Sequence, residues 1–350
     1  MNESGYILPP EWAPQSAIQL TWPHPATDWA DCLGDICATY MQMAAAIADH
    51  ERLIVVAPEP ETVIEELRRN LPAASMANIV FHKCPTDDTW ARDHALITLT
   101  NAQGSARLLD FCFNGWGNKF ASDNDNRINR SLYDSGLLKG QYVDHLDFVL
   151  EGGSIESDGC GTVFTTSQCL LADNRNQPLG QSDIEQRLTD ILGAQRIVWL
   201  DHGNLIGDDT DGHIDTIVRT APDHTLLYVG CDDENDEQYA DLKALEQQLS
   251  TIRTMDDQPY RLLRLPMPNA VTDEDGMRLP ATYANFLVTN EAVLVPVYEQ
   301  PENDAAALRT IGQAFSTHRL VPINSLTIIR QHGSIHCCTM QYPEGVVVLR

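Results

Sequence analysis

The feature that most constrains the fold is one order of elements that recurs along the chain: a strand, a turn, a second strand, an amphipathic helix and a third strand. Its clearest copy begins at residues 213–230, continues through a helical segment at 236–252 and closes with a strand at 261–268. The helical segment carries apolar residues at helical spacing, which predict one buried face: Leu242, Leu245, Leu249 and Ile252. The pattern predicts an α/β chain of repeated units.

Four copies of this order lie within the chain, and a fifth can be assembled only across its two ends. The other three internal copies span residues 95–150, 153–200 and 285–323. The fifth would combine strands at 336–341 and 345–350 with the segments at 17–22, 47–49 and 52–58. Closure by both ends would leave no exposed sheet edge. We therefore expect a single domain over residues 1–350, an α/β propeller of five pseudo-symmetric ββαβ units around a central pocket.

Residues able to do chemistry occupy matching places, at or just before the first strand of each unit. They are Asp93, Glu151, His213 with Asp215, Asn285, and His336 with Cys337. Five units around one axis would bring these side chains to a common pocket.

Cys337 is a candidate nucleophile, and His213 is its best candidate partner. A cysteine becomes reactive when a nearby cation or base favours its thiolate. If residues 213–218 form a strand, alternation puts His213 and Asp215 on one face, with Ile214 on the other. An ordinary acidic turn in front of a strand remains an alternative for this segment.

Two consecutive cysteines near the C-terminus raise the question of which one matters. Alternation along a strand would send Cys337 and Cys338 to opposite faces, so that only one could point into a pocket. A cysteine pair that serves only to fill the core is the competing interpretation.

Two other segments carry signals that are open in the same way. Asp93 follows Arg92 directly, which fits either a pocket carboxylate or a structural ion pair at a strand end. Gly152 and Gly153 would allow a close approach of the backbone to another group, and they would equally suit a bulge.

Composition narrows the partners of the chain. Its 50 Asp and Glu outnumber 23 Lys and Arg, and a formal net charge of -27 argues against nucleic acid. Such a surface would attract a cationic small molecule, or only keep the protein soluble. The nine cysteines form no CxxC pair, which favours reduced thiols. The N-terminus has no signal-peptide pattern and no apolar run reaches membrane-spanning length, so we expect a cytoplasmic protein without a membrane partner.

Taken in order, six motifs resemble the agmatine deiminase and bacterial peptidylarginine deiminase family of the guanidine-modifying superfamily. They span nearly the whole chain: WPHPATDW (22–29), WARD (90–93), FNGWGNKF (113–120), LEGGSIESDGCGT (150–162), TDGHIDT (210–216) and GSIHC (333–337). The resemblance implies a five-unit α/β propeller, in agreement with the repeated element order.

The resemblance also implies roles for individual residues. Cys337 matches the family's nucleophile, His213 its histidine, and Trp90 the tryptophan before the first acid. The acids that bind guanidine fall on Asp93, Asp215 and Glu151. Further candidate substrate contacts are Trp116 and Asn285, with Asp209 and Asp211 at an acidic rim.

The implied reaction is hydrolysis of a guanidino group to a ureido product and ammonia, without metal or organic cofactor. The substrate would be a small cationic guanidino compound, with agmatine first and free or peptide-terminal arginine as alternatives. An amidinotransferase and a non-catalytic guanidino binder are rival hypotheses. The resemblance further suggests a homodimer.

Overall fold

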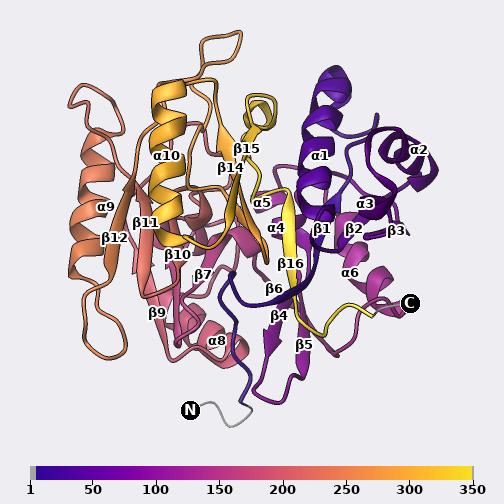
Figure 1. The fold of residues 1–350 in the computed structure, drawn as a ribbon. Helices are drawn as coiled ribbons and strands as arrows, with labels where there is room; N and C mark the ends of the chain where they lie inside the picture. Colours follow the sequence, from indigo (N-terminus) through magenta and orange to yellow (C-terminus); the bar gives the residue numbers. More distant parts are fainter. Residues whose placement is uncertain (1–4, 349–350) are drawn as a thin grey trace.

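The computed structural model describes residues 5–348 and shows an α/β fold with mixed sheets (Figure 1). Within that range the strands form five separate sheets. In every sheet one strand pair is antiparallel, and the next pair, joined across a helix, is parallel. The recurring element order predicted from the sequence is therefore present in the structure.

Four sheets have three strands each, and each is made of consecutive strands. They consist of β4 (Ile97–Thr100), β5 (Ala106–Cys112) and β6 (Gln141–Val149); β7 (Ile155–Ser157), β8 (Thr162–Thr166) and β9 (Arg196–Leu200); β10 (Val218–Ala221), β11 (Thr225–Val229) and β12 (Arg261–Leu265); and β13 (Leu287–Val288), β14 (Ala292–Val297) and β15 (Arg319–Asn324). The second strands β11 and β14 are mainly apolar and almost wholly buried, as expected for strands covered on both faces.

The fifth sheet joins the two ends of the chain in the order β16, β1, β2, β3. Its strands are β16 (Thr339–Pro343), β1 (Gln15–Thr21), β2 (Leu53–Ala57) and β3 (Ile79–Lys83). The predicted pairing of the C-terminal segment with the N-terminal one is confirmed, with Met340 opposite Gln19. The predicted strand at 345–350 is wrong: Val347 makes an isolated bridge to Leu138, and residues 349–350 lie outside the described part.

A long helix connects the parallel strands of each sheet. These helices are α1 (Leu33–Ala48), α6 (Asp125–Asp134), α8 (Gln181–Leu192), α9 (Tyr239–Thr251) and α10 (Pro301–Ala314). In α9 the predicted buried face is formed by Leu242, Leu245 and Leu249, because residues three and four apart share one side of a helix. The other helices are α2 (Pro60–Asn70), α3 (Ala73–Met76), α4 (Ala91–His94), α5 (Gly115–Asn118) and α7 (Ser167–Leu170), with 3₁₀ turns η1 (Ala30–Cys32), η2 (Gly152–Ser154), η3 (Ile214–Thr216) and η4 (Ile328–Gln331).

Two segments that were expected to be strands are turns. Residues 214–216 form η3, and β10 begins only at Val218. Residues 335–338 also form a turn, closed by bonds such as Thr339 N–H to His336 O at 3.0 Å, before β16 begins. The alternation arguments for both segments are therefore wrong, because backbone amides here bond to nearby carbonyls instead of a neighbouring strand.

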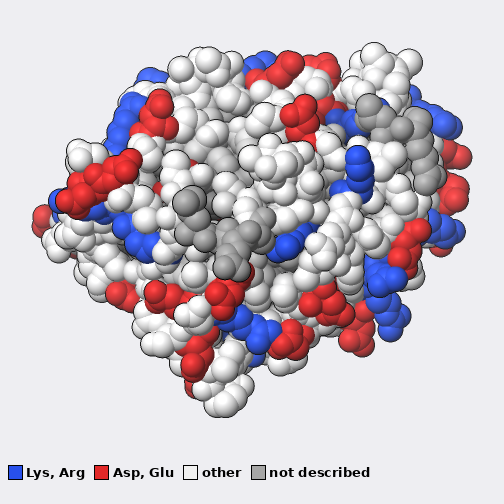
Figure 2. Space-filling model, turned by 90° about the horizontal axis from the view of Figure 1, so that it is seen from below, with Lys and Arg blue, Asp and Glu red and all other residues white. Residues whose placement is uncertain are grey.

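Among the described residues, no helix is long and apolar enough to cross a membrane. Figure 2 shows acidic and basic side chains interspersed over one face of the molecule, with no continuous basic surface on it.

Candidate active site

A cavity with an empty volume of about 360 Å³ opens onto the thiol of Cys337. Its lining combines carboxylates with aromatic rings: Asp28, Asp88, Trp90, Asp93, Trp116, Phe120, Asp209, Thr210, Gln331, His332, Gly333 and Cys337. Four of these residues are aspartates, and no lysine or arginine belongs to this lining. A pocket of this composition suits a cation that presents an apolar or planar body to the rings.

The site is assembled from the turns that precede the first strands of the sheets. Asp93 lies in α4 before β4, Asp215 in η3 before β10, and Cys337 in the turn before β16. The turn η2 contacts both α4 and η3. The matching positions predicted from the sequence therefore do meet in space.

Cys337 is held in a polar, closed environment. Its Sγ lies 3.4 Å from Asn285 Oδ1 and 3.7 Å from Asp215 Oδ2, and the residue is 3% exposed. Burial raises the pKa of the Cys337 thiol well above its usual value, and the carboxylates of Asp215 and Asp93 raise it further. The free protein therefore keeps the proton on the sulfur.

Cys338, the neighbouring cysteine, is absent from the cavity lining and packs in the core with Tyr40. It is fully buried, and burial raises the pKa of its thiol. Only Cys337 faces the cavity, as expected, although a turn and not a strand separates the two side chains.

Asp93 is fixed by two hydrogen bonds. Trp116 Nε1 donates to its Oδ2 at 2.9 Å and the Gly153 amide donates to its Oδ1 at 3.1 Å. Burial, together with the negative charges of Asp215 and Glu151, raises the pKa of Asp93. Its neighbour Arg92 pairs with Glu11 instead, so the alternative of an Arg92–Asp93 ion pair is wrong.

His213 lies beside Asp93, with 3.6 Å between its Nδ1 and Asp93 Oδ1. Neither ring nitrogen has a hydrogen-bond partner, and the side chain is fully buried. Burial lowers the pKa of His213, and the positive charge of Arg175 lowers it further. The imidazole is thus a neutral base with a free nitrogen.

Gly153 shows why the double glycine occurs at this point. A Cβ built on it would lie 2.7 Å from His213 Nδ1, 2.9 Å from Asp93 Oδ1 and 3.2 Å from Asp215 Oδ2. The backbone therefore approaches all three polar side chains as only glycine allows. The interpretation as a close approach, left open by the sequence, is confirmed.

The two carboxylate oxygens of Asp215 have different surroundings. Its Oδ2 lies 2.7 Å from His336 Nδ1 in a hydrogen bond, while its buried Oδ1 has no hydrogen-bond partner among residues 5–348. Asn285 shapes the same corner, because its Oδ1 accepts the His336 amide at 2.9 Å and its Nδ2 donates to Asp215 O at 3.3 Å. Asn285 was expected to contact substrate, but it is absent from the cavity lining and holds the Cys337 turn instead.

Glu151 does not line the cavity. Its carboxylate is completely buried and lies 2.9 Å from Arg175 Nε in an ion pair. Burial raises the pKa of Glu151, and Arg175 counteracts the increase. The role of Glu151 as a guanidine-binding acid stays a prediction, since His213 and Asp215 are likewise absent from the cavity lining. Glu151 and Arg175 form a buried ion pair near His213.

The rim contains only one of the two expected acids. Asp209 lines the cavity, whereas Asp211 is engaged by Lys119 Nζ at 2.7 Å and Arg175 Nη1 at 2.9 Å. Lys119 also donates to Asp209 O at 2.6 Å. Asp211 therefore anchors its loop through these ion pairs, and its contact with substrate stays a prediction.

The two expected tryptophans both line the cavity. Trp90 donates from Nε1 to Asp88 Oδ2 at 3.0 Å, and its ring meets that of Trp116 edge-on with 6.4 Å between centroids. Gly333 lies directly against Trp90, so that a Cβ there would be 2.1 Å from the ring. Both rings thus lie at the cavity, and their contact with substrate stays a prediction.

Two buried groups of side chains have donor atoms close enough to hold a metal ion. Their members lie within 4.8 Å of one another: Glu151, Cys169 and His213, and Glu11, Glu156 and His336. Arg175 already pairs with Glu151, and Arg219 pairs with both Glu11 and Glu156. Because guanidinium groups balance these carboxylates, a metal ion would have to compete with them.

The first comparison with known proteins concerns the fold. A crystal structure of dimethylarginine dimethylaminohydrolase is similar with a TM-score of 0.51 and 13% identity, covering 94% of this chain and 100% of that one. At this identity the likeness concerns the α/β fold alone.

The chain belongs to the family of Porphyromonas-type peptidyl-arginine deiminases, whose sequence pattern matches residues 7–343. A Porphyromonas gingivalis structure named "Putative Arginine Deiminase" is 47% identical with a TM-score of 0.92, covering 98% of this chain and 100% of that one. The C. jejuni agmatine deiminase with substrate bound is 35% identical with a TM-score of 0.88, covering 97% of each chain. A Marinomonas protein named "Putative agmatine deiminase" is 32% identical over 97% of this chain and 95% of its own. The predicted family is confirmed.

Proposed function

We propose that the protein is a hydrolase that removes ammonia from the guanidino group of agmatine, with Cys337 as nucleophile. The observation that carries this proposal is the convergence of Cys337, Asp93 and Asp215 at a buried site whose cavity is acidic. Relatives named agmatine deiminase support it.

Binding would use the two aspartates on either side of the thiol. A guanidinium is planar and has only N–H donors, so carboxylates on two sides can fix it and expose its central carbon. The unpartnered Oδ1 of Asp215 offers one such acceptor. Asp93 would provide the other, held by Trp116.

The bound cation would also activate the thiol. Its positive charge offsets the carboxylates that raise the pKa of Cys337 in the free protein. The thiol proton passes to neutral His213, and Sγ attacks the guanidinium carbon to form a tetrahedral adduct. His213 then returns that proton to the departing nitrogen, and ammonia leaves.

Hydrolysis completes the cycle. His213 takes a proton from water, which adds to the carbon of the S-alkylthiouronium intermediate. The C–S bond breaks, His213 returns its proton to the Cys337 sulfur, the hydroxyl of the adduct loses its own proton to solvent, and the neutral ureido product is released.

Agmatine is favoured over arginine by the charges around the cavity. Asp28, Asp88 and Asp209 line it beyond the reaction centre, together with His332. A distal ammonium is attracted by these carboxylates, whereas the carboxylate of arginine would be repelled. Arginine-type substrates stay the alternative, because the P. gingivalis relative carries that name.

The architecture completes the proposal. We propose that the five sheets surround one axis as an α/β propeller, in a single domain over residues 1–350. The enzyme would act in the cytoplasm, as a homodimer.

The first test is ammonia release from agmatine, arginine, a C-terminal arginyl peptide and methylguanidine, for the wild type and Cys337→Ser. Turnover of agmatine that disappears in the variant would support the proposal. Binding of agmatine without ammonia release would contradict it, unless an added amine restores turnover, which would identify an amidinotransferase.

A further inference from the structure

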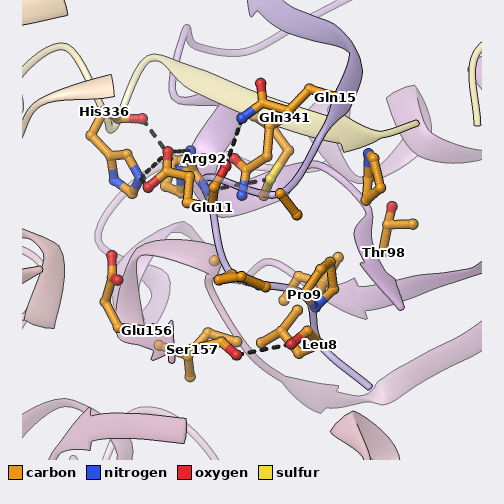
Figure 3. Close-up of a pocket in the computed structure, with 17 residues that line it drawn as sticks. Leu8, Pro9, Glu11, Gln15, Arg92, Thr98, Glu156, Ser157, His336 and Gln341 are labelled. Atoms are coloured by element: carbon orange, nitrogen blue, oxygen red, sulfur yellow. Dashed lines mark hydrogen bonds and ion pairs between the residues drawn. The ribbon is translucent and has the colours of Figure 1, made fainter. Parts of the chain in front are cut away.

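A second cavity lies next to the candidate active site, and the two linings share no residue. The consecutive residues His336 and Cys337 line different cavities. Figure 3 shows His336 directed toward Glu11, with Arg92 beside them. His336 therefore connects the active-site carboxylate Asp215 with a polar cluster outside the reaction centre.

The connection is a buried chain of three side chains. His336 Nδ1 lies 2.7 Å from Asp215 Oδ2, and Nε2 lies 3.1 and 3.2 Å from the two oxygens of Glu11. Each nitrogen–oxygen contact needs a proton between its atoms. The row formed by Asp215, His336 and Glu11 thus contains two hydrogen-bonding protons, one at each ring nitrogen. These two bonds fix the orientation of the imidazole.

Glu11 is itself held in place. Arg92 Nη2 lies 3.4 Å from its Oε1, and Arg219 forms an ion pair with its other oxygen. Arg219 also pairs with Glu156. Burial and the charges of Arg219 and Arg92 lower the pKa of His336, while Asp215 raises it.

We propose that His336 and Glu11 are positioning residues, which orient Asp215 so that its free Oδ1 receives the guanidinium of the substrate. The inference rests on the proposed function and deepens it. It follows from the division of labour on Asp215, whose Oδ2 is occupied by His336 while Oδ1 has no partner. Without this bond the carboxylate could rotate, and the guanidinium carbon would move off the line to Cys337.

Two substitutions of His336 separate positioning from packing. In His336→Asn the amide nitrogen replaces Nδ1 and keeps the donor to Asp215. In His336→Gln the amide nitrogen replaces Nε2, keeps the contact with Glu11 and loses the donor to Asp215. Both changes remove the ring, so a purely structural role would affect them alike.

Kinetics of ammonia release from agmatine provide the main readout, with kcat and KM measured separately. We expect kcat/KM of His336→Gln to fall about 100-fold, mainly in kcat. The kcat/KM of His336→Asn should stay within about tenfold of the wild-type value, because this variant loses only the contact with Glu11. Equal losses in the two variants, or a more active His336→Gln, would overturn the proposal.

Glu11→Gln extends the test to a residue that does not touch Cys337, with Glu156→Gln as matched control. Each variant removes one carboxylate charge that pairs with Arg219. Of these two acids, only Glu11 is hydrogen-bonded to His336 in the described structure. We expect Glu11→Gln to lower kcat about tenfold and Glu156→Gln to change it less than about twofold. Equal effects would overturn the proposal. A wild type that releases no ammonia would instead refute the proposed function.

Discussion

The two adjacent cysteines differ in surroundings although they share burial. Cys337 faces the acidic cavity, and Cys338 packs beside Tyr40. Their side chains are chemically identical, so each is the natural control for the other.

We expect Cys337→Ser to lower kcat by at least about 1,000-fold, because a serine hydroxyl is a far weaker nucleophile at this site. Cys338→Ser should keep activity within about twofold. Ammonia release measured side by side checks both values. Activity that depended on Cys338 would contradict the assignment.

Gly153 is the residue at which the smallest change should have the largest effect. Gly153→Ala would push a methyl group against His213, Asp93 and Asp215. We expect kcat/KM to fall at least about 100-fold. The control is Gly34→Ala in α1, where a Cβ meets nothing within 4 Å. Equal activity of the two variants would show that the close approach at Gly153 is unimportant.

At the scale of the element, an exposed lysine side chain contacts the loop that carries Asp209. Lys119, next to α5, donates to Asp209 O and Asp211 Oδ1. These hydrogen bonds connect the acidic rim of the cavity with the segment that holds Trp116.

We expect Lys119→Met to raise KM for agmatine roughly three- to fivefold with little change in kcat, since a partly exposed ion pair contributes about 1 kcal/mol. The control is Lys243→Met, which removes an exposed lysine that pairs with Glu246 within α9. A change in kcat without a change in KM would contradict a role of Lys119 in substrate binding.

The sequence predicted elements well where apolar runs and helical spacing were strong, as in β14 and α9. It failed at residues 213–216 and 335–338, where the local pattern also fits a strand but the chain turns. These turns are set by tertiary contacts such as Asn285 Oδ1 with the His336 amide, 51 residues apart. Glu11 was missed for the same reason, because no local motif marks an acid that acts through a distant histidine.

At the scale of the whole molecule, one joint between neighbouring sheets contains a buried acid. Glu51, before β2, accepts the Asn290 amide at 3.0 Å from the turn between β13 and β14. Its other oxygen is buried without a partner. Burial raises the pKa of Glu51 to about 7 from an ordinary value of 4.5.

This joint should make the stability of the protein depend on pH. A folded-state pKa above the unfolded value means that the folded state binds the extra proton, so stability is lost as pH rises from about 4.5 to 7. Glu51→Gln should therefore match the wild type near pH 5 and exceed it at pH 8 by roughly 3 kcal/mol at most. Urea unfolding at both pH values tests this, and an equal difference at the two values would contradict it.

The pairing of β16 with β1 also bears on how the protein is made. The candidate nucleophile precedes β16 directly, and β16 completes a sheet whose other strands come from the first part of the chain. A ribosome-bound or prematurely ended chain therefore holds the carboxylates of the site without its thiol. On the proposed function, catalysis would therefore require that β16 and the turn before it have joined this sheet.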